Sequence, residues 1–426
     1  MIKRILDIKI KGLSLDELIW YLVLLFLLIE SNIISWFLAI IFFLWILRGR
    51  YKDLIVRMKQ GPFLSIFSLY IVYVIGMIYT SNIEYGFQKL ETKFGMIIIP
   101  ILLLSYNDFF VGEGFWRYSK AFVYFVLFVL IFCFLRACYL FGYELYCRHY
   151  GIELDEYPYT NYFFSSYLSA FMHYGYFAMY VNVAIILIYS DLLNSSPLRL
   201  FSKKSTALLV VVFLSLGVFF LYSKVGMFTN VLIHIYYFLL FVKVTMSWKT
   251  LLKSSIVVLI LMIILSVVFP ENIERFKLVQ NVFIEKKTDS TSVESTQLRY
   301  YAWKASIQLS KKAFLTGHGT GDVNDLLIEQ YRKMNYVGAL KKQINSHNQF
   351  LQTQIAIGII GVLLLLCFFI STFLTAIQKK NHSLQIYVII LFIALLFESY
   401  LETQAGVIYL SFFTFFLSFY EKDKLA

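Results

Sequence analysis

Charged residues are scarce in this chain, and their scarcity excludes an ordinary soluble protein. They make up 15% of the 426 residues, whereas 60% are hydrophobic and 19% are aromatic. A soluble fold of this size cannot bury that much apolar surface, so lipid must solvate most of the chain. The sequence therefore predicts an all-α, polytopic membrane protein that resides in a lipid bilayer.

Cysteine, proline and processing signals are equally sparse. Cys133, Cys138 and Cys367 fall inside apolar runs and only Cys147 is expected outside them, so no disulfide framework is indicated. The five prolines give little sign of the broken helices that mark transporters with inverted repeats. The first apolar run lacks a small-residue cleavage site, so we expect no cleavable signal peptide.

Long apolar runs are what the sequence has in abundance. Compared with the ~20 residues that a helix needs to cross the hydrocarbon, they predict about twelve transmembrane helices. We place these helices at roughly residues 15–30, 33–47, 62–79, 94–105, 121–141, 166–189, 205–222, 225–242, 254–270, 355–377, 384–397 and 404–420.

The net charge of +12 follows this topology and does not indicate nucleic-acid binding. With the N-terminus in the cytoplasm, most Lys and Arg residues fall in cytoplasmic tails and loops, as the positive-inside rule requires. The short loops on the other side carry only Lys89, Lys93, Arg148 and Lys224. We therefore expect both termini in the cytoplasm and the long segment 271–353 outside.

Three regions follow from this topology. Residues 1–270 are expected to hold helices 1–9, residues 271–353 a long outer loop, and residues 354–426 helices 10–12. Inside the loop, apolar residues recur at helical spacing over 294–312, and a second helix is expected over 322–334 with Asp322 as its N-cap. Both helices are too polar to span and should lie on the outer membrane face. The other outer segment, residues 142–165, is rich in Tyr and acidic residues.

Charges near membrane depth need a physical reason because they are costly there. Lys224 sits between two apolar runs, and it is either an interfacial lysine that snorkels or a fixed cation for an anionic headgroup. Lys93 is expected at the same depth, near the outer interface of the membrane. It either pairs with Glu91, anchors the helix at the interface or binds a ligand. Arg136 and His173, within or near spans, are expected to snorkel and to pack, respectively.

The long loop holds the remaining candidates. Arg299 lies one helical turn before Trp303, and its guanidinium can bind phosphate oxygens in a bidentate manner. His347 stands at the start of the tenth span, where an imidazole can act as a general base. The alternative for Ser346, His347 and Asn348 is a capping cluster that only satisfies free amides of that helix.

The glycine-rich stretch Gly317 to Gly321, which contains His318, resembles a phosphate-binding loop only superficially. It follows no strand, so a flexible turn is the better interpretation, although its amides could contact an anion. No metal-ligand spacing is present, and acidic pairs such as Asp322 with Asp325 are weak candidates for a divalent cation. We expect neither a metal nor a cofactor.

Three motifs follow one another in the second half of the chain: Leu298 to Trp303, Thr316 to Asp322, and Ser346 to Leu351 running on to Gly361. Together they resemble the signature of the O-antigen ligase and polymerase superfamily in their order, their spacing and their position before a late span. Ser223-Lys224 resembles that family's Ser-Arg step, with Lys in place of Arg. The stretches 162–180 and 402–409 resemble Bacteroidetes-type members more loosely.

The resemblance implies an inverting glycosyltransferase on the periplasmic face of the bacterial inner membrane. The donor would be a glycan on undecaprenyl pyrophosphate, and the acceptor a sugar hydroxyl of lipid A-core. Arg299, with Lys224 and Lys93, would stabilise the pyrophosphate, and His347 would act as general base. Substrate contacts would also come from Trp303, Asn348 and His318.

Two alternatives stay open at this point. An O-antigen polymerase shares these motifs but uses a second lipid-linked glycan as acceptor, and we favour the ligase because chain length, span count and loop position match that branch. A polysaccharide or lipid transporter would place its ionisable residues along a path through the membrane. Here they gather at the outer interface.

Overall fold

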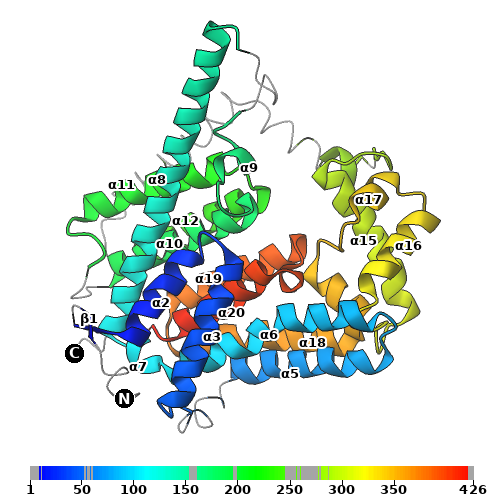
Figure 1. The fold of residues 1–426 in the computed structure, drawn as a ribbon, viewed down its shortest axis with the longest axis horizontal. Helices are drawn as coiled ribbons and strands as arrows, with labels where there is room; N and C mark the ends of the chain where they lie inside the picture. Colours follow the sequence, from blue (N-terminus) through cyan, green and yellow to red (C-terminus); the bar gives the residue numbers. More distant parts are fainter. Residues whose placement is uncertain are drawn as a thin grey trace.

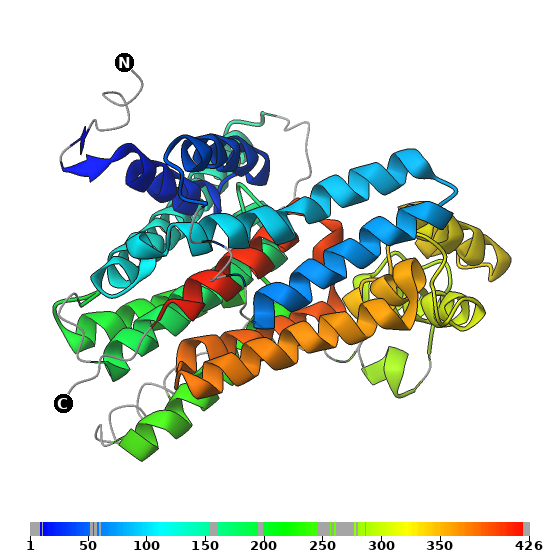
Figure 2. The ribbon, with the colours of Figure 1, turned by 90° about the horizontal axis from the view of Figure 1, so that it is seen from below.

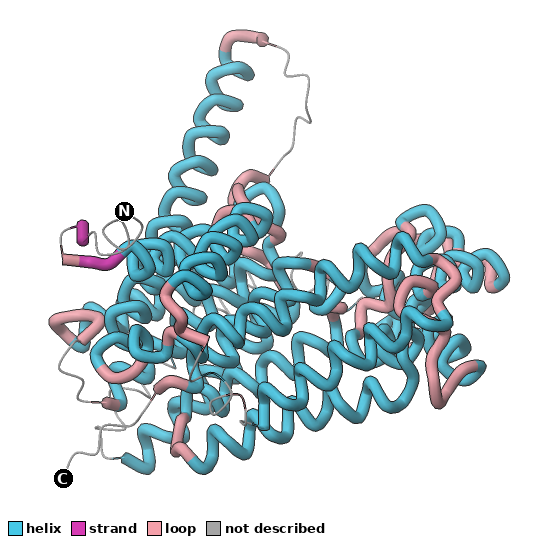
Figure 3. The backbone as a smooth tube through the Cα atoms, turned by 60° about the horizontal axis from the view of Figure 1, so that its bottom comes forward, coloured by secondary structure: helices cyan, strands magenta, loops and turns pink. Residues whose placement is uncertain are grey.

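The computed structural model describes residues 9–420, apart from 11, 52–53, 55–57, 59–60, 153–160, 195–198, 245–255, 257–259, 261–276, 278–279 and 286. Within these residues the fold is almost entirely helical (Figure 3). One small hairpin, β1 (Lys9–Ile10) with β2 (Leu13–Ser14), precedes the first helix. The helices are α2 (Leu15–Phe26), α3 (Ser31–Leu47), α5 (Gly61–Ile75), η1 (Gly76–Tyr79), α6 (Ile83–Ser105), α7 (Asn107–Phe110), α8 (Glu113–His149), α9 (Ser165–Leu168), α10 (Tyr174–Leu193), α11 (Lys204–Phe220), α12 (Lys224–Val244), α15 (Ser295–Lys312), α16 (Val323–Lys333), α17 (Val337–Lys342), α18 (Gln349–Gln378), α19 (His382–Phe397), η2 (Tyr400–Glu402) and α20 (Gln404–Ser418).

The prediction of a multi-pass helical membrane protein is confirmed in its coarse form. Among the described residues, the helical stretches long and apolar enough to cross a membrane are Gly61–Tyr79, Glu113–His149, Tyr174–Leu193, Lys224–Phe241 and Gln349–Gln378. Shorter apolar helices cover Ile33–Leu47, Lys204–Phe220, His382–Phe397 and Gln404–Ser418. The total of twelve spans stays a prediction, and the span expected at 254–270 lies, except for residues 256 and 260, outside the described residues.

The helices of the long segment gather at one end of the molecule. There α15, α16 and α17 lie beside the ends of α5 and α18, and both α15 and α16 contact α18 (Figures 1 and 2). The hairpin β1–β2 and the C-terminal end of α20 lie toward the opposite end. The side of the membrane that each end faces stays a prediction.

Helix α8 is much longer than the span predicted at 121–141. Its 37 residues correspond to about 55 Å of helix at 1.5 Å per residue, against ~30 Å of hydrocarbon. One end therefore projects beyond the bundle (Figure 1). The outer segment expected at 142–165 begins as a continuation of this helix to His149, and its acidic centre, residues 153–160, is outside the described residues.

Both helices expected within the long segment are present. Helix α15 begins after Glu294, whose carboxylate accepts hydrogen bonds from the first free amides of the helix. Asp322 occupies the N-cap position of α16, as predicted, but its side chain does not cap that helix. Instead the carboxylate accepts from the backbone N–H groups of Ser81 and Asn82, which ties α16 to the start of α6.

Helix α18 is broken at Ile357 and Gly358, where the backbone leaves helical geometry. The amides of His318 and Gly319 donate to two carbonyl groups of α18, at 2.8 and 2.9 Å, and replace hydrogen bonds that the break would leave unmade. Gly358 has φ of +70°, and a Cβ built there would lie 2.1 Å from the carbonyl oxygen of Leu315. Glycine is therefore required at this crossing.

Candidate functional site

A cavity of about 370 Å³ lies where the end of the helical bundle meets α15. Its walls come from the starts of α10 and α12, the first turns of α15 and the segment after α19. Eight of the twenty lining residues are Phe, Tyr or Trp, and the charged side chains in the lining are Lys224, Arg299 and Glu398. The other lining residues include His173, Tyr174, Tyr176, Phe228, Trp303, Phe397 and Tyr400.

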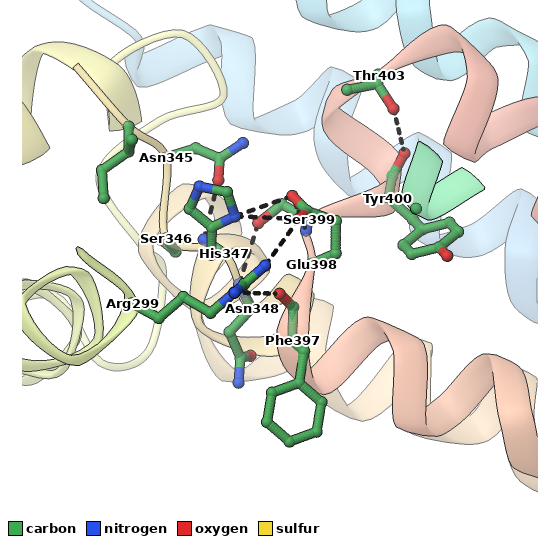
Figure 4. A network of polar contacts seen from close by, with 12 residues as sticks. Arg299, Asn345, Ser346, His347, Asn348, Phe397, Glu398, Ser399, Tyr400 and Thr403 are labelled. Atoms are coloured by element: carbon green, nitrogen blue, oxygen red, sulfur yellow. Dashed lines mark hydrogen bonds and ion pairs between the residues drawn. The ribbon is translucent and has the colours of Figure 1, made fainter. Parts of the chain in front are cut away.

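Glu398 joins the two residues predicted to be catalytic (Figure 4). The Nδ1 atom of His347 lies 3.1 Å from the Glu398 carboxylate oxygens. A terminal nitrogen of Arg299 lies 3.7 Å from the same carboxylate, and its Nε donates to the carbonyl oxygen of Phe397 at 3.1 Å. Arg299 and His347, 48 positions apart in the sequence, therefore meet at one acidic side chain.

The backbone at His347 is held in an unusual conformation. Its φ of +44° is in the left-handed region, which few residues other than glycine adopt. The His347 N–H donates to the side-chain oxygen of Asn345 at 2.9 Å, and the indole of Trp303 donates to the His347 carbonyl at 3.4 Å. Strain of this kind persists only where neighbouring contacts enforce it, and it is common in functional sites.

Lys224 begins α12 and points to the start of α15. Its Nζ donates to the hydroxyl of Thr296 at 2.7 Å and lies 3.4 Å from a carboxylate oxygen of Glu294. Burial alone would raise the pKa of Glu294, but the Lys224 charge and hydrogen bonds from the helix start hold this pKa below its usual value. Lys224 thus links α12 to α15 and also lines the cavity.

The pKa of Glu398 is governed by its neighbours. Burial would raise it, yet the hydrogen bond and charge of His347 and the charge of Arg299 outweigh burial, so the pKa lies below its usual value. Glu398 is therefore an anion at neutral pH. A partly buried anion between a guanidinium and an imidazole fixes the position of both groups.

Lys93 lies elsewhere. It is 1% exposed and its Nζ lies 2.7 Å from Glu402, rather than pairing with Glu91 as one sequence interpretation had it. Lys89 approaches the same carboxylate at 3.3 Å. Lys93 does not line the cavity, so its substrate contact stays a prediction without support from this geometry.

His318 and Asn348 also have structural partners. The His318 Nε2 lies 3.0 Å from the carbonyl oxygen of Leu309, within the turn that crosses α18. The Asn348 side chain caps α18 by accepting from the Leu351 N–H, while its amide donates to Leu396. Capping by Asn348 is thus observed, whereas the Ser346 hydroxyl instead accepts a hydrogen bond from Ser306. Substrate binding by His318 and Asn348 stays a prediction.

Two other residues noted from the sequence also have partners. The Arg136 guanidinium donates to the carbonyl oxygen of Tyr167 at 2.9 Å. His173 caps the start of α10 by accepting from the Gly175 N–H, and its ring lines the cavity. Neither contact makes these residues part of the Glu398 cluster.

Sequence reasoning missed Glu398, the residue that unites the cluster. A signal was present, because Glu398 follows directly after an apolar run that ends at Phe397, and an acidic residue at such a position is unusual. Nothing in the sequence, however, shows that this residue meets His347.

The family comparison agrees with the motifs found in the sequence. A family model described as O-antigen ligase matches residues 209–366. The matched region contains Lys224, Arg299 and His347 but ends before Glu398. No curated protein matches the chain significantly. Residues 209–366 are therefore similar to the O-antigen ligase family.

Proposed function

We propose that this chain is an O-antigen ligase-like glycosyltransferase of the bacterial inner membrane, with segment 271–353 in the periplasm. It transfers a glycan from undecaprenyl pyrophosphate to a sugar hydroxyl of lipid A-core, with inversion and without a metal. The observation that carries the proposal is the meeting of Arg299, Glu398 and His347 beside a cavity that Lys224 also lines.

Two cations stabilise the leaving group, which is the pyrophosphate. Cleavage of the sugar–phosphate bond develops negative charge on the pyrophosphate, which fixed cations stabilise strongly in a site with little water. Arg299 and Lys224 both line the cavity and are each held by carboxylates and hydrogen bonds. Because their positions are set before the donor binds, little reorganisation is needed as the charge develops.

His347 activates the nucleophile, which is the acceptor hydroxyl. As the acceptor oxygen attacks the anomeric carbon, its proton passes to the imidazole, and the electrons of the broken bond remain on the pyrophosphate. General-base assistance of this kind is typically worth about 10² to 10⁴ in rate. Attack from the side opposite the leaving group inverts the anomeric configuration.

The acceptor separates ligase from polymerase, and the family supports either reaction. The lipopolysaccharide ladder of a deletion strain decides between them when lipid-linked glycan is assayed in parallel. Loss of all core-attached glycan, with long polymer left on the lipid carrier, is the result expected for a ligase. A single attached repeat unit would identify a polymerase, and an unchanged ladder would refute glycan transfer by this chain.

Complementation of that strain tests the site. Arg299→Ala and His347→Ala should insert normally but fail to restore the ladder, since one removes a cation and the other the base. A suitable control is His149→Ala, because His149 is exposed at the projecting end of α8. Full transfer by either site variant would refute the assignment.

A further inference from the structure

We propose that Glu398 is a positioning residue that selects the tautomer of His347 and stabilises its protonated form during transfer. This inference rests on the proposed function, because it assumes that His347 is the base. It adds a residue that lies outside the region matched by the family model.

The first support is the contact itself. The His347 Nδ1 is 3.1 Å from the Glu398 carboxylate. Because an ionised carboxylate can only accept a hydrogen bond, Nδ1 carries the proton and donates it. The Nε2 atom then has a free electron pair. Only this tautomer can accept a proton from an acceptor hydroxyl through Nε2.

The second support is the way both partners are held. A backbone N–H of Ser399 reaches the Glu398 carboxylate at 3.3 Å, and the Asn348 N–H donates to the Ser399 hydroxyl at 3.2 Å. The segment 397–399 is thus tied to Asn348, the residue directly after His347 and before α18. Together with the left-handed backbone of His347, these bonds leave the imidazole little freedom to turn away.

The chemistry follows from this arrangement. When the acceptor oxygen bonds to the anomeric carbon and the carbon–phosphate oxygen bond breaks, the hydroxyl proton moves to Nε2 and His347 becomes an imidazolium. Glu398 stays ionised and faces that new positive charge. The proton leaves to water after the products part, so Glu398 never accepts it.

The charged groups near His347 determine how stable its protonated form is. Arg299 from α15 contacts the same carboxylate and disfavours an imidazolium, and His173 at the start of α10 lines the cavity beside Glu398. Glu398 is the anion in contact with the imidazole. Removal of its charge therefore takes away the group that stabilises the imidazolium formed during transfer.

The test is the rate of transfer, separated into kcat and the KM for lipid A-core. It is measured with membrane-embedded protein, lipid-linked glycan extracted from the deletion strain and its lipid A-core as acceptor. In Glu398→Gln, which removes the charge but keeps the size of the side chain, kcat should drop at least about tenfold while KM changes little. Glu398→Asp, which keeps the charge, should restore much of kcat.

The outcomes are separable. A wild-type kcat in Glu398→Gln, or a loss of kcat that Glu398→Asp restores in no part, would overturn the positioning role while leaving the proposed function intact. Failure of the wild type to transfer glycan would overturn the proposed function itself. Glu329→Gln, on an exposed face of α16, is the matched control and should keep both kcat and KM.

Discussion

At the scale of single residues, Arg299 shows why two basic side chains are not equivalent. Its guanidinium binds the Phe397 carbonyl through Nε and faces Glu398 through a terminal nitrogen, and it still has further N–H groups to offer a phosphate. A lysine would carry the same charge but cannot make the first contact and present a planar pair of donors at once.

We therefore expect Arg299→Lys to lower glycan transfer by about 10²-fold, in the range found when one preorganised donor is removed. The measurement is the initial rate of transfer in membranes with equal amounts of inserted protein. Lys304→Met on the same helix is the control, because this exposed lysine lies over the ring of Tyr300 and outside the cavity. A normal rate for Arg299→Lys would mean that charge alone matters.

At the scale of elements, the break in α18 depends on glycine. Gly358→Ala places a side chain at a φ of +70° and against the Leu315 carbonyl. The left-handed conformation alone costs a residue with a Cβ about 1–2 kcal/mol. Because the clash with the carbonyl adds to this cost, we expect the unfolding free energy to fall by more than about 1 kcal/mol. Thermal unfolding in detergent measures the effect.

Gly142→Ala provides the contrast. Gly142 lies inside the exposed part of α8, and a Cβ there meets no atom within 4 Å. Alanine is a better helix former than glycine by about 1 kcal/mol, so this variant should be as stable as the wild type or more so. Equal destabilisation by both substitutions would contradict the account of the α18 break.

The link between α6 and η2 is a buried ion pair. Lys93 and Glu402 are 1% and 6% exposed in their side chains, and Lys89 supports them from the edge. Burial would raise the pKa of Glu402, but the two lysines hold it below its usual value. Because η2 continues from the segment that carries Glu398, this pair anchors one wall of the cavity.

We expect Lys93→Met to destabilise the protein by up to about 3–5 kcal/mol, since it leaves a buried carboxylate with a single, partly exposed partner. The double variant Lys93→Met with Glu402→Met removes both charges and should recover much of this loss. Thermal unfolding of the purified variants in detergent is the measurement. A double variant no more stable than the single one would argue against a simple ion-pair role.

At the scale of the whole molecule, the arrangement of the ends can be tested directly. The α15–α17 helices lie opposite the hairpin β1–β2 and the C-terminal end of α20 (Figure 2), and the distribution of basic residues predicts that the termini are cytoplasmic. In a background without native cysteines, Glu329→Cys on α16 should react with an impermeant maleimide added to spheroplasts. A cysteine that reacts only after the membrane is broken would reverse the predicted orientation.

The sequence by itself determined the helical, multi-pass nature of this protein, the positions of α15 and α16, and the resemblance to the O-antigen ligase superfamily. Apolar runs, helical periodicity and short motifs depend on neighbouring residues, so they can be read without coordinates. Only the tertiary structure decided which distant side chains meet. Glu398 and His347 are 51 positions apart and Lys93 and Glu402 are 309 apart, and such pairs exist only because helix packing brings separate segments of the chain together.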